Sequence, residues 1–237
     1  MLLLLATLAS ADESTMSYDV YLAGKDVGDR TVTVRFLQRD DGERRVLSVV
    51  TKASAPIGEV SCRQSGQSSP RGANFTTSLQ VGAEVSEVQG IQAPNGGWQL
   101  VRADTEGVHE AALKPTQVTF TTLDLFDPGR TRLLGGTGHV GVLVAETGAI
   151  VEGELKAGES TTVKVAGKSL AGTRYVVDGE GGHAEFVVDE NGVLLSSQLS
   201  FFGGVMETRA KTVPEPRSFG TIDVVETPGS GTKEADL

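Results

Sequence analysis

Apolar and polar residues alternate with a period of two over much of the chain, which is the pattern of half-buried β-strands. The clearest stretch is residues 74–81, and residues 31–36 alternate equally well. Successive side chains of a strand point to opposite faces of its sheet, so each segment would place one apolar face against a core. Further segments of this kind are residues 18–22, 173–177, 184–188 and 193–202.

Turn sequences separate several of these segments. Asn95-Gly96, Asp178-Gly179 and Asn191-Gly192 each lie between two β-rich runs. Asparagine, aspartate and glycine tolerate positive φ, which both central residues of a type I′ hairpin turn require. We therefore predict an antiparallel sheet of neighbouring strands, with turns at these three positions.

Helical periodicity is scarce. One short helix is predicted at residues 121–128, with Thr121 as N-cap, Asp124 three residues later and Pro128 at its end, and residues 132–135 add another turn. The segment near 121–141 is expected to cross between two halves of the sheet.

The chain has too little helix to cover the apolar faces of its strands, so these faces must pack on each other. We predict an all-β fold: a curled antiparallel sheet, as a half-open barrel or a sandwich, with at most one or two short helices.

The chain is predicted to have three parts. Residues 1–11 combine an apolar run with a small-residue end, as in a secretory signal peptide, and cleavage is predicted between Ala11 and Asp12. Residues 12–226 are expected to form a single β-rich domain, and residues 227–237 a disordered tail. The sequence therefore predicts an exported protein of the periplasm or the extracellular space.

Composition restricts the classes of partner. The 237-residue chain has a formal charge of −10 at pH 7, whereas nucleic-acid binding requires clustered lysine and arginine, so no nucleic-acid partner is expected. No segment after the predicted signal reaches the roughly 18 apolar residues of a membrane helix, so no integral membrane segment is expected. Cys62 is the single cysteine, which excludes an intramolecular disulfide, and we expect it to be chemically inert.

Two local patterns resemble known families. Tyr18–Gly24 is followed by Val27-Gly28, and Tyr175 is followed by the run Phe186–Leu194. Together they resemble uncharacterised bacterial periplasmic families with a domain of unknown function, in which a first hairpin opens a curved antiparallel sheet. The pattern of antiparallel strands is also similar to the lipoprotein-carrier (LolA/LolB-like) fold, a half-open barrel with an apolar concave face. The resemblance implies this sheet architecture and supplies no catalytic residues.

Motifs for catalysis and metal binding are weak. No serine lies in the G-x-S-x-G context of a hydrolase nucleophile. Gly136–Gly141 matches a dinucleotide fingerprint, but the strand and helix that must flank it are not predicted. His109, His139 and His183 lie far apart, and none belongs to a zinc motif such as H-E-x-x-H. We therefore expect no catalytic residue, no metal site and no cofactor.

A ligand site is predicted near the end of the last long strand. Phe201 and Phe202 would point to opposite faces of that strand, so one of them must leave the main core face. Gly203 and Gly204 would let a ligand approach the backbone closely. Together with Trp98, these four residues are the predicted ligand-binding residues.

Three functions are consistent with these patterns. The first is a non-catalytic cell-envelope protein that binds an apolar or lipid-like ligand. The second is a structural or assembly protein that binds another envelope protein, and the third, weaker alternative is a hydrolase whose site is assembled from distant residues. An apolar cavity would favour the first, an exposed apolar patch or open sheet edge the second, and a Ser/His/acid cluster the third.

Overall fold

The computed structural model describes residues 12–39, 42–56, 58–131, 138–201 and 204–212. Fifteen strands of this part form one sheet, which confirms the all-β prediction of a curled antiparallel sheet. The strands are β1 (Asp12–Leu22), β2 (Lys25–Arg39), β3 (Gly42–Ala55), β4 (Gly58–Ser69), β5 (Gly72–Val81), β6 (Glu84–Gln92), β7 (Trp98–Asp104), β8 (Gly107–Leu113), β9 (Phe120–Thr121), β10 (Gly138–Val144), β11 (Ala149–Val165), β12 (Lys168–Glu180), β13 (Gly182–Val188), β14 (Leu194–Phe201) and β15 (Gly204–Ala210).

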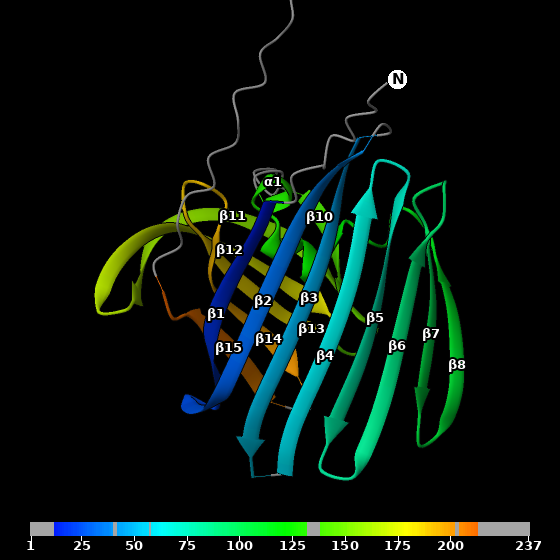
Figure 1. The fold of residues 1–237 in the computed structure, drawn as a ribbon, viewed down its shortest axis with the longest axis horizontal. Coiled ribbons are helices and arrows are strands. Elements are labelled where there is room, and N and C mark those ends of the chain that lie inside the picture. The colour runs from blue at the N-terminus through cyan, green and yellow to red at the C-terminus, as the bar shows by residue number, and fades with distance from the viewer. Residues whose placement is uncertain (1–11, 40–41, 57, 132–137, 202–203, 213–237) are drawn as a thin grey trace, which may run out of the picture.

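The sheet has two halves, which we define as β1–β8 and β9–β15. Strands within each half pair with their sequence neighbours, antiparallel except for the parallel pair β9–β10. The halves meet where β1 pairs antiparallel with β15, with Tyr18 opposite Ala210. The sheet then curls, so that the second half passes behind β1–β4 in Figure 1.

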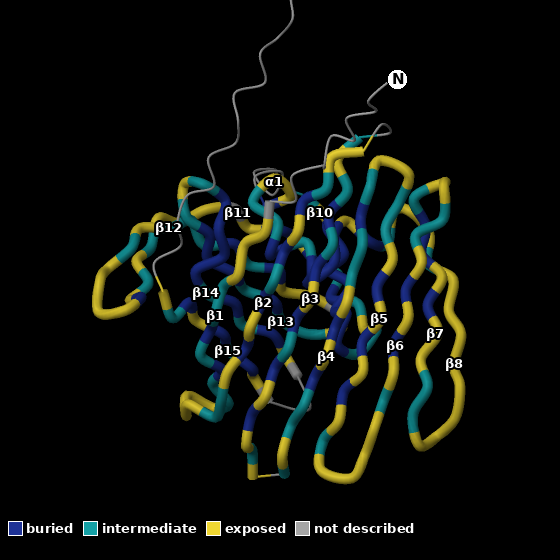
Figure 2. The backbone as a smooth tube through the Cα atoms, in the orientation of Figure 1, coloured by how far each residue is buried: buried dark blue, intermediate teal, exposed yellow. Residues whose placement is uncertain are grey.

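The predicted alternation is confirmed on the strands that form the core. On β2, Val32, Val34 and Phe36 are buried, and on β5, Phe75 and Leu79 are buried while their neighbours are exposed. Figure 2 shows this alternation as changing colour along the strands. Because both halves turn their apolar faces inward, the core lies inside the curl of the sheet.

The connection between the halves contains two short helices, η1 (Thr122–Phe126) and α1 (Pro128–Thr131). The predicted capping box is confirmed: Thr121 accepts a hydrogen bond from the Asp124 backbone, and Asp124 accepts one from the Thr121 backbone. Pro128 does not end the helical segment as predicted. The η1 helix ends at Phe126, and Pro128 begins α1, a position where its missing N–H costs nothing. The predicted turn at 132–135 lies outside the described residues.

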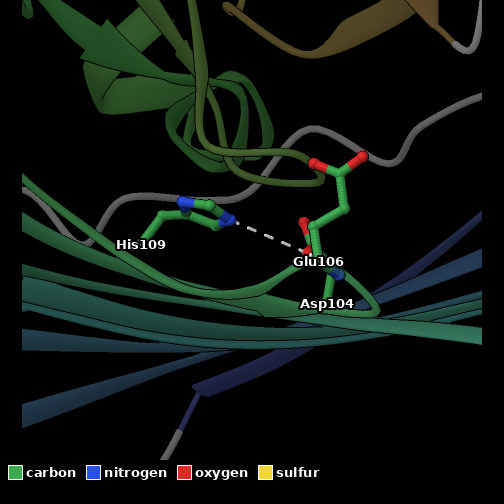
Figure 3. Close-up of side chains that lie close together, drawn as sticks. All are labelled: Asp104, Glu106 and His109. Atoms are coloured by element: carbon green, nitrogen blue, oxygen red, sulfur yellow. Dashed lines mark hydrogen bonds and ion pairs between the residues drawn. The ribbon is translucent and has the colours of Figure 1, made fainter.

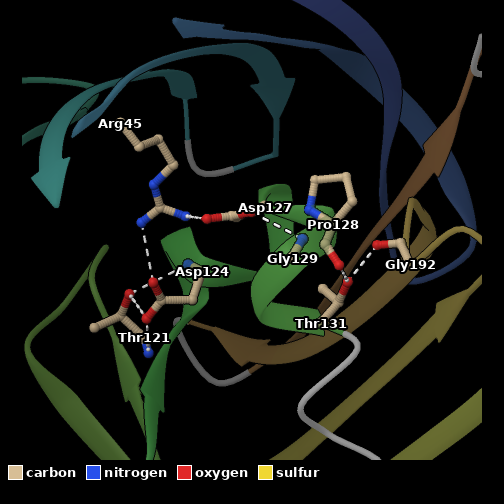
Figure 4. Close-up of polar contacts among 8 residues, drawn as sticks. All are labelled: Arg45, Thr121, Asp124, Asp127, Pro128, Gly129, Thr131 and Gly192. Atoms are coloured by element: carbon tan, nitrogen blue, oxygen red, sulfur yellow. Dashed lines mark hydrogen bonds and ion pairs between the residues drawn. The ribbon is translucent and has the colours of Figure 1, made fainter. Parts of the chain in front are cut away.

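Arg45 on β3 anchors this helical connection (Figure 4). Its guanidinium donates to Asp124 Oδ1 and Asp127 Oδ2, both at 3.0 Å. Thr131 in turn donates to the backbone carbonyl of Gly192 in the second half.

Among the described residues, no helix has the length and apolar character needed to cross a membrane.

Two predicted turns are confirmed and one is wrong. Asn95-Gly96 and Asn191-Gly192 lie in turns, with both glycines at positive φ. Strand β12 continues through Asp178-Gly179, however, and Gly179 pairs with Gly182 across a turn at Gly181. The glycine at 179 serves close strand packing, because a Cβ there would lie 1.8 Å from the carbonyl oxygen of Glu152.

A buried ion pair links the two halves through the core. Arg30 on β2 and Glu146 in the turn after β10 are 2% and 1% exposed, and Arg30 Nη2 donates to Glu146 Oε1 at 3.3 Å. Arg30 Nε also donates to Thr51 Oγ1 at 2.9 Å, and Thr122 Oγ1 donates to Glu146 Oε2 at 2.9 Å. Buried charges require such pairing and hydrogen bonding. These contacts of Arg30 and Glu146 therefore hold the β10–β11 turn against the first half of the sheet.

Candidate functional site

Strand β8 forms one edge of the sheet and is exposed on both faces. It follows β7 at the end of the strand order, and residues 107–112 are all exposed. In Figure 2 this strand and its turn are yellow over most of their length. Alternate backbone N–H and C=O groups of an edge strand have no partner strand, so β8 presents a template for pairing with another chain.

The outer face beside this edge carries exposed apolar side chains. Leu100 on β7 is buried, so Val101 and its partner Glu110 lie on the opposite, outer face. Val108 is 68% exposed and lies opposite Ala103 on the same face. We call the following exposed residues of β6–β8 the edge patch: Val85, Ile91, Val101 and Val108.

The inner face of β5–β8 is hollowed. One open hollow of about 580 Å³ is lined by residues that include Leu79, Val81, Arg102 and Asp104. A second, of about 210 Å³, lies between β6–β8 and the β10–β11 turn, with Val88, Leu100 and Arg102 among its lining residues. The β10–β11 turn reaches the first half at Val88, which lies against Gly148.

The turn between β7 and β8 brings an acid and imidazole cluster to this inner face (Figure 3). The donor atoms of Asp104, Glu106 and His109 all lie within 4.8 Å of one another. Asp104 Oδ1 accepts a hydrogen bond from the Glu106 backbone N–H at 2.9 Å and lies 3.9 Å from His109 Nε2. Carboxylate oxygen and imidazole nitrogen are ligands for divalent ions such as zinc.

Asp104 is held as an anion within the cluster. Its side chain is 10% exposed, and its Oδ2 lies 2.7 Å from Arg102 Nη2. The backbone N–H of Glu106 is the main cause that lowers the pKa of Asp104, and the Arg102 guanidinium lowers it further. The carboxylate is therefore ionised and fixed in orientation at neutral pH.

Cys62 lies on the inner face of β4 and is buried. Burial is the main cause that raises the pKa of its thiol to about 12, with a smaller contribution from the Glu146 carboxylate. Because the thiolate is the reactive form of cysteine, this thiol is a poor nucleophile at neutral pH.

The structure describes only some of the predicted ligand-binding residues. Trp98 is buried in the core against Phe75, with ring centroids 5.7 Å apart. Phe201 pairs with Gly204 at the end of β14, and Phe202 and Gly203 lie outside the described residues.

Arg102, Asp104 and Glu106 belong to no recognisable motif in the sequence. One signal was available: Arg102 and Asp104 have the same parity as Trp98 and Leu100, so the alternation of β7 directs all four inward. The position of His109 beside them depends on the hairpin register, which places His109 opposite Arg102.

Comparisons with known proteins give a match in structure and none in sequence. No protein-family model matches the chain, and no curated protein matches it in sequence. Among solved structures, the chain is similar to the crystal structure of a beta-barrel-like protein of domain of unknown function DUF1849 from Brucella abortus. The two share 12% sequence identity over 86% of this chain and 97% of the other, with a TM-score of 0.44. This chain is a β-sheet protein with a structural match to that beta-barrel-like protein.

Proposed function

We propose that the protein is a non-catalytic binding protein of the cell envelope, and that β8 is the edge to which an extended segment of another envelope protein binds. The observation that carries this proposal is the exposure of β8 on both faces at the edge of the sheet. The location in the envelope rests on the predicted signal peptide. Addition of a strand to an exposed edge is a recurrent mode of protein recognition.

The side chains around β8 define the chemistry of the partner strand. Apolar side chains on one face of that strand would cover the edge patch, whose most exposed member is Val108. Glu87 and Glu110 lie on the same outer face and are exposed. The complementary segment therefore carries both apolar residues and lysine or arginine on the one face that continues this outer face, at every second position of its strand, because opposite charges pair favourably across strands.

Site-specific photo-crosslinking in the producing cells tests this proposal. A photo-reactive amino acid at position 108 is expected to give a discrete crosslinked product. The matched control is Val205, which is 45% exposed but lies on β15, between two paired strands. Adding Ala112→Lys should remove the product, because a lysine on an edge strand opposes pairing and repels a basic partner. Equal crosslinking from both positions, or a product that persists with Ala112→Lys, would contradict the proposal.

The inner hollows favour a second candidate ligand, an amphipathic lipid-like molecule. Leu79, Val81, Val88 and Leu100 contribute apolar surface, and Arg102 lines both hollows. An acyl chain would lie on the apolar surface while its carboxylate binds the Arg102 guanidinium, since charge-assisted hydrogen bonds to arginine are strong.

Titration with a fluorescent fatty acid tests the lipid candidate. Arg102→Gln is expected to weaken binding about tenfold, as loss of one charge-assisted hydrogen bond predicts. The matched control is Arg35→Gln, because Arg35 is an exposed arginine that pairs with Glu13 far from the hollows. A signal that does not saturate, or the same loss in both variants, would exclude this ligand class.

A further inference from the structure

We propose that Asp104, Glu106 and His109 form a binding site for a zinc-like divalent metal ion at the β7–β8 turn. Asp104 ends β7, Glu106 lies in the turn, and His109 lies on β8. Two carboxylates and one imidazole provide the mixed oxygen and nitrogen ligands that zinc accepts. Imidazole also favours transition-metal ions over magnesium and calcium, which prefer oxygen ligands alone.

The spacing of the donor atoms suits a single ion. Bonds of about 2.0–2.2 Å from zinc place its ligand atoms roughly 3.3–3.6 Å apart in a tetrahedral site. The three donor atoms lie within 4.8 Å of one another, and Asp104 Oδ1 is 3.9 Å from His109 Nε2. Glu106 and His109 are exposed, so small rotations of their side chains would close the remaining gap.

Asp104 supplies a preformed ligand. Its side chain is nine-tenths buried, and its inaccessible Oδ2 accepts no hydrogen bond of good geometry within the described residues. The close cation at Oδ2 is Arg102 Nη2, which leaves Oδ1 facing His109. A contact to the non-ligating oxygen of a metal-binding carboxylate helps to fix the orientation of that ligand.

The other histidines provide an internal contrast. His183 also lies between two carboxylates, but its Nδ1 contacts Asp178 at 2.5 Å while its Nε2 lies 3.8 Å from Glu185. The two acids therefore approach opposite ring nitrogens and cannot share one ion with the imidazole. His139 Nδ1 lies 3.8 Å from a single carboxylate oxygen, Glu154 Oε1, and both side chains are mostly exposed.

The surroundings leave room for water to complete the coordination. Asp104 and Glu106 line the larger hollow, which is open to solvent. Glu84 adds a further carboxylate to the lining, so the hollow has more acidic than basic groups. None of the three ligands belongs to the edge patch, although His109 lies on β8 and Arg102 contacts Asp104.

Calorimetric titration of the tag-free protein with zinc chloride tests the site. One saturable binding event is expected, and His109→Ala and Glu106→Gln should each weaken the Kd at least about tenfold. The matched control His183→Ala should leave the Kd unchanged. Because all three positions are substantially solvent-accessible, folding of the variants can be verified by identical circular dichroism spectra.

Three results would overturn the proposal. The first is the absence of saturable zinc binding. The second is an equal loss of affinity in His183→Ala and His109→Ala, which would show that zinc binds non-specifically to histidines. The third is tighter binding of calcium than of zinc with no effect of His109→Ala, which would show an acidic site that does not use the imidazole.

Discussion

Replacing Arg30 with methionine is expected to destabilise the fold by about 3–5 kcal/mol, because removing one partner of a buried ion pair leaves the other charge uncompensated. The charge left behind is Glu146, which is 1% exposed and keeps only the Thr122 hydroxyl as a hydrogen-bond donor among the described side chains. Urea unfolding followed by circular dichroism measures the change in the free energy of unfolding.

A double variant separates the ion pair from simple loss of packing. When Glu146→Leu is combined with Arg30→Met, the buried charge disappears, so the double variant should lose much less stability than the sum of the two single variants. If Arg30→Met costs less than about 1 kcal/mol, or if the two effects are additive, the pair does not hold the two halves together as described.

Truncation of Phe186 is expected to be similarly severe. Phe186 on β13 is fully buried and contacts Phe120 edge-to-face, with centroids 5.6 Å apart, and stacks on Tyr175 at 6.2 Å. Phe186→Ala should cost about 3–5 kcal/mol in the free energy of unfolding, because the substitution loses buried apolar area and leaves a cavity.

Two substitutions calibrate that result in the same unfolding assay. Phe186→Leu should cost less than Phe186→Ala, because it keeps most of the buried volume. Val205→Ala should stay within about 0.5 kcal/mol, because Val205 is exposed. A Phe186→Ala variant as stable as Val205→Ala would contradict the placement of this ring in the core.

Much of the fold follows from local patterns in the sequence. The period-two alternation of β2 and β5 and the capping box at Thr121 act within a few residues, so each is visible without knowledge of the rest of the chain. The error at Asp178-Gly179 has a physical cause. Glycine permits both a turn and a close strand contact, and only the pairing of β11 with β12 decides between them.

The sites were harder to predict because they depend on contacts between distant segments. Arg30 shares the parity of Val32 and Val34, so its inward direction is present in the sequence. Its partner Glu146 lies 116 residues away, and nothing local pairs the two. Likewise, Asp104 and His109 meet only through the register of their hairpin, and the position of β8 at the sheet edge depends on the strand order of the whole sheet.

The pairing of β1 with β15 also determines the order in which the molecule can fold. Most strand pairs join sequence neighbours and form quickly, whereas Tyr18 and Ala210 are separated by 192 residues. Until β15 has been synthesised, β1 retains an unpaired edge in an otherwise assembled half-sheet. Such intermediates aggregate readily. Separation of each chain from other copies until its last described strand has paired would prevent such aggregation.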